Sequence, residues 1–168
     1  YSVFLNCQVS DASHCATEAP EERAGWPPLP GDYRVLRFHA PVAVCTLNSD
    51  DLILRLAAAR PPGLSIVGSL HTENLGIEHL IRNLLHNPHV RFLVVCGEDT
   101  RKAIGHLPGQ SLVSLMREGL DENGRIHGAQ GKRPILKNVR REQVEAFRRR
   151  LQVVDLIGTT DLEAITGS

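Results

Sequence analysis

A histidine flanked by glycines is the residue of this sequence with the clearest chemical potential. His106 lies in the stretch CGEDTRKAIGHLPGQS, residues 96–111, which directly follows the apolar run VRFLVV. Neutral imidazole is a frequent metal ligand and general base, and Gly105 and Gly109 would let the backbone approach a large flat ligand closely. Gln110 and Ser111 begin the next predicted helix, whose N–H groups would point at the same space. From these residues alone, a surface histidine in a turn is the alternative.

Other donor residues carry weaker signals. Cys7, His14 and Cys15 have the donor types of a zinc site, but their spacing is not a known ligand pattern and a fourth ligand is missing. Cys45 and Cys96 stand inside apolar runs, which predicts buried free thiols and fits a reducing compartment.

Histidines and arginines also cluster along the chain. His79 and His86 are seven residues apart, too far for one ion, so we expect a solvated surface for them and for His71 and His89. The arginines of the last long helix alternate with glutamates, which favours a solvated helix face, with partner docking as the alternative. They are Arg140, Arg141, Arg148, Arg149 and Arg150.

Composition indicates one ordinary globular domain. The chain has 168 residues, 42% hydrophobic and 23% charged, and its 19 basic residues balance 19 acidic ones. A net charge of zero argues against a broadly basic nucleic-acid binder, and 4% aromatics argue against stacking platforms for single strands. No apolar segment is long enough to span a membrane and no secretory signal is visible, so we expect a cytoplasmic protein.

Strands and helices alternate along the sequence. Buried strands are predicted at 41–47, 64–70 and 90–97, and a last strand follows the helix that begins near residue 140. Helices are predicted over 50–59, 77–85 and 109–119, with Thr72 or Asn74 as N-cap of the second and Gly119 closing the third. Residues 10–32 are expected to be irregular, and 121–134 to be a polar loop with a turn at 123–124.

This alternation predicts an α/β fold: a Rossmann-like, mostly parallel sheet with helices on both faces, in a single domain. Ligands of such sheets bind beyond the carboxyl ends of the strands. The loops at 69–74, at 96–111 and after Leu47 leave strands at that edge, so His106 is expected where a ligand would bind.

Three blocks of the sequence resemble the A subunit of tetrahydromethanopterin S-methyltransferase. They are GWPPLPGDY with PVAVCTL; TENLGIEHLIRNLLHNPHVRFLVVCG; and GHLPGQSL with GLDENGRIHGAQGKRPILKN and VVDLIG. The blocks run in order from about Gly25 to Gly158. We therefore expect residues 25–168 to form the domain and residues 1–24 to be an N-terminal arm or the remnant of an upstream segment. A chain that begins at Tyr1 is expected to be a processed protein or part of a longer one.

The resemblance implies a corrinoid-binding methyl carrier. The family binds a cobalamin-type corrinoid, and the histidine of its GH-x-x-GQS loop, here His106, is the lower axial ligand of cobalt. The cobalt receives a methyl group from a methyl-tetrahydropterin that one partner bears, and passes it to a thiol acceptor on another partner, coenzyme M in the family. This places the chain in one-carbon metabolism and methanogenesis, as a methyltransferase subunit without a membrane helix of its own. Association with a membrane through partner subunits is the alternative location.

The same resemblance and the expected edge of the sheet select the cofactor-binding residues. With His106 as catalytic residue and cobalt ligand, they are Leu70, Thr72, Glu73, Asn74, Leu75, Gly76, Gly97, Gly105, Leu107, Gly109, Gln110, Ser111, Gly128 and Ala129. The pterin, the thiol partner and the oligomeric state are left open. A corrinoid-binding or delivery module without methyl transfer, and an interaction domain that has lost the corrinoid, are the alternatives.

One position departs from other corrinoid proteins that ligate cobalt through histidine. They carry Asp-x-His-x-x-Gly, whereas Ile104 occupies the aspartate position here. The carboxylate that would orient the imidazole is therefore missing locally. A backbone carbonyl, a water or a distant side chain must take its role.

Overall fold

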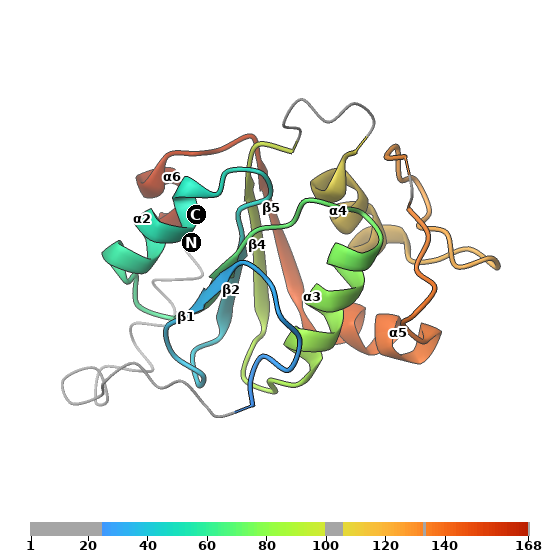
Figure 1. The fold of residues 1–168 in the computed structure, drawn as a ribbon, viewed down its shortest axis with the longest axis horizontal. Helices are drawn as coiled ribbons and strands as arrows, with labels where there is room; N and C mark the ends of the chain where they lie inside the picture. Colours follow the sequence, from blue (N-terminus) through green and yellow to red (C-terminus); the bar gives the residue numbers. More distant parts are fainter. Residues whose placement is uncertain (1–24, 100–105, 133, 168) are drawn as a thin grey trace.

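A five-stranded sheet between two layers of helices forms the body of the protein (Figure 1). The computed structural model describes residues 25–99, 106–132 and 134–167, so the expected arm at 1–24 lies outside the described residues. The elements are β1 (Tyr33–Val35), β2 (Val42–Cys45), α2 (Asp51–Ala59), β3 (Leu64–Gly68), α3 (Leu75–Leu85), β4 (Phe92–Gly97), α4 (Pro108–Glu118), α5 (Arg141–Arg150), β5 (Gln152–Ile157) and α6 (Leu162–Thr166). The predicted α/β class with a mostly parallel sheet is confirmed.

The strand order places a switch point at the centre of the sheet. The order is β1-β3-β2-β4-β5, with β2, β3, β4 and β5 parallel and β1 antiparallel to β3. The chain leaves β2 toward β3 on one side and then crosses to β4 on the other. Ligands of doubly wound sheets bind where the order reverses in this way, outside the carboxyl ends of the strands. The segment that follows β4 therefore begins at the favoured edge.

Alternating side chains of the strands build two apolar layers. Ala43 and Cys45 of β2 belong to the cluster that α3, α4 and α5 cover, whereas Val42 and Val44 belong to the cluster that α2 and α6 cover. A strand buried on both faces reads as a continuous apolar run, which is why VAVC is buried at all four positions. Helices on both faces are thus confirmed.

Two short elements were absent from the sequence expectations. β1 has only three residues and follows a proline-rich segment, so nothing local distinguishes it; its pairing with β3 defines it. α6 has five residues, and the Asp161 side chain accepts a hydrogen bond from the N–H of Ala164 at its start.

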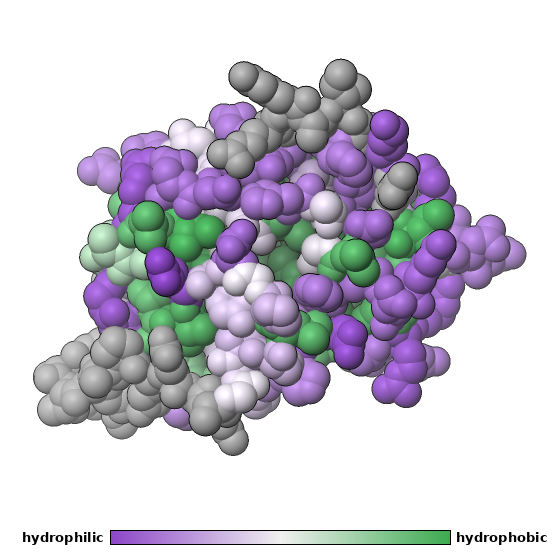
Figure 2. All heavy atoms as spheres, viewed as in Figure 1, coloured by the Kyte–Doolittle hydropathy of each residue, from purple (hydrophilic) through white to green (hydrophobic). Residues whose placement is uncertain are grey.

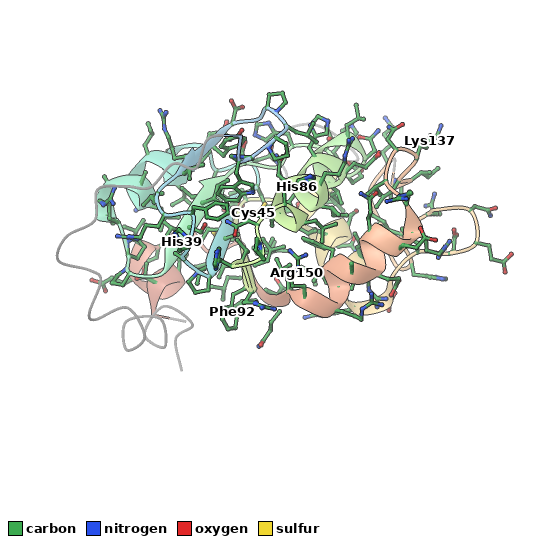
Figure 3. The ribbon with its side chains drawn as sticks, turned by 90° about the horizontal axis from the view of Figure 1, so that it is seen from below. His39, Cys45, His86, Phe92, Lys137 and Arg150 are labelled. Atoms are coloured by element: carbon green, nitrogen blue, oxygen red, sulfur yellow. The ribbon has the colours of Figure 1, made fainter. Side chains whose placement is uncertain are left out.

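The arginine-rich helix α5 is not simply a solvated face. Arg150 donates to the backbone carbonyls of Leu84, Leu85 and Asn87 at the end of α3 (Figure 3). Arg148 pairs with Glu145 and donates to two carbonyls at the end of α4. Carbonyls at a helix end lack intrahelical partners, so these two side chains fasten α5 to its neighbours. The predicted solvated surface holds for Arg149.

No helix within the described ranges is long and apolar enough to cross a membrane.

Candidate functional site

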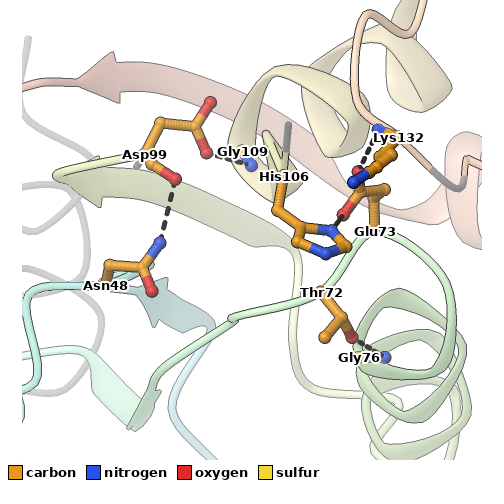
Figure 4. Close-up of polar contacts among 8 residues, drawn as sticks. All are labelled: Asn48, Thr72, Glu73, Gly76, Asp99, His106, Gly109 and Lys132. Atoms are coloured by element: carbon orange, nitrogen blue, oxygen red, sulfur yellow. Dashed lines mark hydrogen bonds and ion pairs between the residues drawn. The ribbon is translucent and has the colours of Figure 1, made fainter. Parts of the chain in front are cut away.

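His106 lies at the carboxyl edge of the sheet, immediately before α4. Its ring Nδ1 is 2.7 Å from Oε2 of Glu73, in the loop between β3 and α3 (Figure 4). The Glu73 side chain is fully buried, whereas the His106 side chain is 33% exposed. The two residues are 33 positions apart in sequence. The distant side chain that the sequence requires in place of an aspartate at position 104 is therefore Glu73.

This contact determines which ring nitrogen of His106 is available. A carboxylate only accepts hydrogen bonds, so Nδ1 facing Glu73 carries the proton in the paired state. The other nitrogen, Nε2, then keeps its lone pair. It makes no hydrogen bond to another described residue. A neutral imidazole that donates through one nitrogen to a carboxylate and exposes the other is the usual arrangement of a metal-ligating histidine.

Asp99 fixes the start of α4 beside His106. Its two carboxylate oxygens accept the N–H groups of Gly109 at 2.6 Å and Gln110 at 2.9 Å, and its backbone carbonyl accepts the side-chain amide of Asn48 (Figure 4). The carboxylate thereby satisfies N–H groups that a helix leaves unpaired and complements its dipole. The amide N–H groups of Gly109 and Gln110 are consequently engaged by the protein itself rather than turned toward a ligand.

A loop on the far side of α3 and α4 closes the site. We call residues 128–138 the strap. The Gln110 side chain donates to the carbonyl of Gly128 and accepts the N–H of Gln130. Glu73 Oε1 accepts the N–H of Lys132 at 2.6 Å. Further along, the buried Glu78 accepts the N–H of Asn138, also at 2.6 Å. Two buried carboxylates of the α3 segment therefore hold this backbone in place.

Comparison with known proteins assigns this architecture to a family. The family model described as tetrahydromethanopterin S-methyltransferase, A subunit, matches residues 19–168. The chain belongs to this family. It is 43% identical over 143 residues to the second of two such A subunits of Methanothermobacter thermautotrophicus, covering 83% of this chain and 73% of the relative. The A subunit of the same enzyme from Methanocaldococcus jannaschii is 42% identical over 147 residues, 87% of this chain and 58% of the relative.

Membership of the A subunit family makes the chain a methyltransferase subunit, which implies partner subunits. The structure brings together residues from all three of the sequence blocks that resemble the family. Glu73 belongs to TENLGIE, His106 and Gln110 to GHLPGQSL, and Lys132 to the glycine-rich strap. These motif residues bond to one another, so the blocks describe one connected site.

Residues at the start of α3 divide between structural and exposed positions. Thr72 Oγ1 accepts the N–H of Gly76, so Thr72 supplies the cap while Asn74 occupies the N-cap position without a side-chain bond. Leu70 is buried. Leu75 is 53% exposed and is one of the two large apolar side chains that the described surface presents in this way. An exposed leucine two residues after Glu73 offers apolar contact to a ligand.

The remaining predicted cofactor-binding residues lie around α4, β4 and the strap. Ser111 is completely buried, and its hydroxyl has no hydrogen-bond partner within the described residues. Leu107 is the N-cap residue of α4, and Gly128 and Ala129 lie in the strap. Gly105 lies outside the described residues.

Gly97 has a packing explanation of its own. Its φ is +80°, a left-handed value that favours glycine. A Cβ there would overlap the carbonyl of Thr46 and lie 3.0 Å from Cβ of Ser49. The glycine is therefore needed by the loop after β2, and its contact with a cofactor stays a prediction.

A cavity of about 260 Å³ opens between the sheet and α3, next to the same loop. Apolar side chains are visible in the hollow on this face (Figure 2). Small residues at Ala43, Cys45, Gly68 and Gly76 line it, together with three predicted cofactor-binding positions, Leu70, Thr72 and Gly76 again. The histidines His71 and His79 also line it.

Neither buried thiol of the sheet has the chemistry of a nucleophile. Burial raises the pKa of the Cys45 thiol to about 12, with a smaller opposing effect of a backbone hydrogen bond from Leu47. Burial likewise raises the pKa of Cys96 to about 12. A thiol is a nucleophile only as thiolate, so both remain inert core residues, as the sequence predicts. Cys7, His14 and Cys15 lie outside the described residues.

Sequence reasoning missed two of the acidic residues of the site. Asp99 caps α4 across a ten-residue gap, and Glu78 holds the strap across sixty residues. For Glu78 a signal exists: a glutamate stands between Ile77 and Ile81 on a helix face that faces the core, where an unpaired charge would be costly. For Asp99 no periodic signal exists, because it lies in a loop.

Proposed function

We propose that the chain binds a cobalamin-type corrinoid and carries a methyl group on its cobalt within a methyltransferase. The observation that carries this proposal is the His106–Glu73 pair at the carboxyl edge of the sheet. It supplies a neutral nitrogen donor, oriented by a buried carboxylate, at the edge where this fold binds ligands. Membership of the A subunit family supports the methyl-transfer role.

The residues present fit such a cofactor. His106 offers a partly exposed Nε2, which is the donor type that cobalt accepts from imidazole. The buried hydroxyl of Ser111 lacks a partner among the described residues, and buried polar groups normally have one. Leu75 presents an apolar side chain at the start of α3. These residues would provide ligation, a hydrogen bond and apolar contact.

Each residue has a separate task in this proposal. A bound corrinoid would supply a cobalt atom that accepts a methyl group from a methyl-tetrahydropterin and yields it to a thiol on a partner subunit. His106 would bind cobalt through Nε2. Glu73 would keep the proton on Nδ1 and hold the ring in one orientation. Asp99 would keep the start of α4, and with it the backbone next to His106, in a fixed place.

The decisive experiment is cobalamin binding by wild type, His106→Ala and His71→Ala. His71 is the matched control because it also pairs with a carboxylate, Asp50 at 2.9 Å, but lies outside the Glu73 contact. Each protein is mixed with hydroxocobalamin, desalted, and examined by absorption and by EPR after reduction to Co(II). Nitrogen superhyperfine splitting in wild type and His71→Ala, and its absence in His106→Ala, is the expected result.

Other outcomes select the alternatives. Cobalamin retained with no difference between the three proteins would remove His106 as ligand while leaving a corrinoid-binding module. No retention by wild type would leave an interaction domain that shares only the fold. Loaded protein that takes no methyl group from either methyl-tetrahydromethanopterin or methyl-tetrahydrofolate, with the partner subunits present, would indicate delivery rather than methyl transfer.

A further inference from the structure

The Glu73 carboxylate faces two donors that belong to different parts of the protein. Oε2 receives the ring N–H of His106, and Oε1 receives the backbone N–H of Lys132 in the strap. One rigid, buried carboxylate therefore joins the proposed ligand histidine to a surface loop. Any rotation or shift of this group is felt at both ends, because both oxygens belong to one planar unit.

The strap is packed against this carboxylate with no spare space. A Cβ built on Gly131 would overlap the Oε1 atom of Glu73 and lie 2.9 Å from its Cδ. Gly131 has no left-handed φ, so steric closeness to Glu73 explains the glycine. Two other anchors of the strap do not involve Glu73: Gln110 holds Gln130, and Glu78 holds Asn138.

We propose that Glu73 couples the ligation of His106 to the seating of the strap, so that the strap reports the state of the site at the protein surface. This inference rests on the proposed function. When Nε2 is bound to a metal, the proton stays on Nδ1 and the ring is fixed, so Glu73 is fixed and the N–H of Lys132 has a constant acceptor. When Nε2 is released, the ring is free to turn and to exchange tautomers, and the acceptor at Lys132 becomes less constant.

The consequence is a change at a place that a partner can touch. Lys132 and Lys137 of the strap are exposed, as are Gln130 and Asn138. Lys137 projects from the edge of the molecule beyond α5 (Figure 3). A partner that contacts the strap would meet a more ordered segment when His106 is bound to cobalt. Coupling of this kind is reciprocal: if ligation favours the seated strap, the seated strap favours ligation by the same factor.

Amide hydrogen exchange of the wild-type chain, measured by NMR with and without bound hydroxocobalamin, tests the coupling. Exchange at Lys132 is expected to slow about tenfold on loading, the effect of a hydrogen bond strengthened by about 1.4 kcal/mol. Gln130 and Asn138 flank Lys132 and are held by other side chains, so their exchange should change less than about twofold. If the corrinoid merely covers the strap, all three amides slow together, and the proposal is overturned.

A second arm tests the reciprocal effect. Gly131→Ala should push the strap away from Glu73 and weaken hydroxocobalamin binding about tenfold, within the usual range of coupling between sites. Glu78→Gln is the matched control, because it alters the other anchored end of the strap without touching Glu73. Equal binding by Gly131→Ala and Glu78→Gln would sink the coupling.

The outcomes separate this inference from the proposed function. If wild type retains no cobalamin, the proposed function fails and the inference with it. If cobalamin is retained with His106 as its EPR-detected ligand, and Lys132 exchanges as before, only the coupling fails.

Discussion

Replacing Glu73 by glutamine should reverse the tautomer of His106. The carboxylate of Glu73 receives two donors, the Lys132 N–H at 2.6 Å and the His106 ring at 2.7 Å. A carboxamide of the same shape has one acceptor oxygen and one NH₂ donor. The backbone N–H of Lys132 cannot become an acceptor, so the glutamine oxygen must face it. The NH₂ group then faces His106, whose Nδ1 has to accept and whose proton has to move to Nε2.

The magnitude follows from this exchange of donors. Binding a metal through Nε2 would require the proton to return to Nδ1, where two donors would face each other at about hydrogen-bond distance. A lost hydrogen bond to a charged group, with a buried donor left unsatisfied, costs about 1–3 kcal/mol. Loss of such a partner typically weakens metal binding about 10- to 100-fold, which agrees with that energy. Folding stability should fall less, because both amide groups of the glutamine retain a partner.

The ring nitrogen shifts of ¹⁵N-labelled histidine measure the tautomer directly, without any cofactor. Spectra are recorded at about pH 8.5, where an ordinary imidazole is neutral, and His106 is assigned by its absence from His106→Ala. Wild type should show the proton on Nδ1 and Glu73→Gln on Nε2. Glu78→Gln controls for loss of a buried carboxylate near the same helix. A His106 that stays protonated on Nδ1 in Glu73→Gln, or equal hydroxocobalamin affinity in the two glutamine variants, would refute the reasoning.

Three further predictions concern the elements that position the site. Asp99→Ala removes the acceptor of two N–H groups at the start of α4; the free energy of unfolding should fall by about 2 kcal/mol and the melting temperature by about 4–8 °C, and an unchanged urea midpoint would contradict the cap. Arg150→Met should cost about 1–3 kcal/mol by leaving carbonyls at the end of α3 unpaired, with Arg149→Met as the exposed control. In a Cys7→Ser, Cys15→Ser background, Cys45 and Cys96 should resist alkylation at pH 8 until urea unfolds the chain, because burial raises both pKa values from 9.0 to about 12; stability should decrease as pH rises from about 9 toward 12, since only the unfolded thiols ionise there, and fast labelling of the native protein would contradict their burial.

Periodic patterns were enough to predict most of the fold. The apolar runs of β2, β3 and β4 are buried on both faces of the sheet and therefore continuous in sequence. The 3.6-residue repeat of α3 survives because one face of the helix packs on the sheet. β1 escaped because three residues cannot show a period, and its strand character comes from pairing with β3 more than thirty residues away.

The site was predictable in its position but not in its contacts. His106 and the loop after β3 could be placed at one edge, because parallel strands end together. The partnership of His106 with Glu73 could not, since it depends on how far the loop reaches and on the burial of the carboxylate. The absence of an aspartate at Ile104 showed that a partner was needed without showing which one. Asp99 was invisible for the same reason: its effect acts across a loop.

Arginine function was also beyond a local reading. In sequence, Arg148 and Arg150 look like the solvated half of an amphipathic helix, because glutamates alternate with them. Their long side chains instead reach carbonyl groups on two other helices. Such contacts depend on the arrangement of three helices and carry no signature in the sequence of one.

The single tryptophan provides an optical probe of the site's foundation. Trp26 is buried, its ring meets Phe38 edge to face with 5.4 Å between ring centroids, and its indole N–H donates to the carbonyl of Asn83 on α3 at 2.8 Å. Asn83 also lines the cavity beside α3. Fluorescence of the unmodified protein therefore comes from one indole attached to the helix whose first turn follows Glu73. A corrinoid absorbs strongly where tryptophan emits, so loading should quench this emission by energy transfer, and a displacement of α3 should shift its wavelength. One titration would then record occupancy and helix movement as two separate signals.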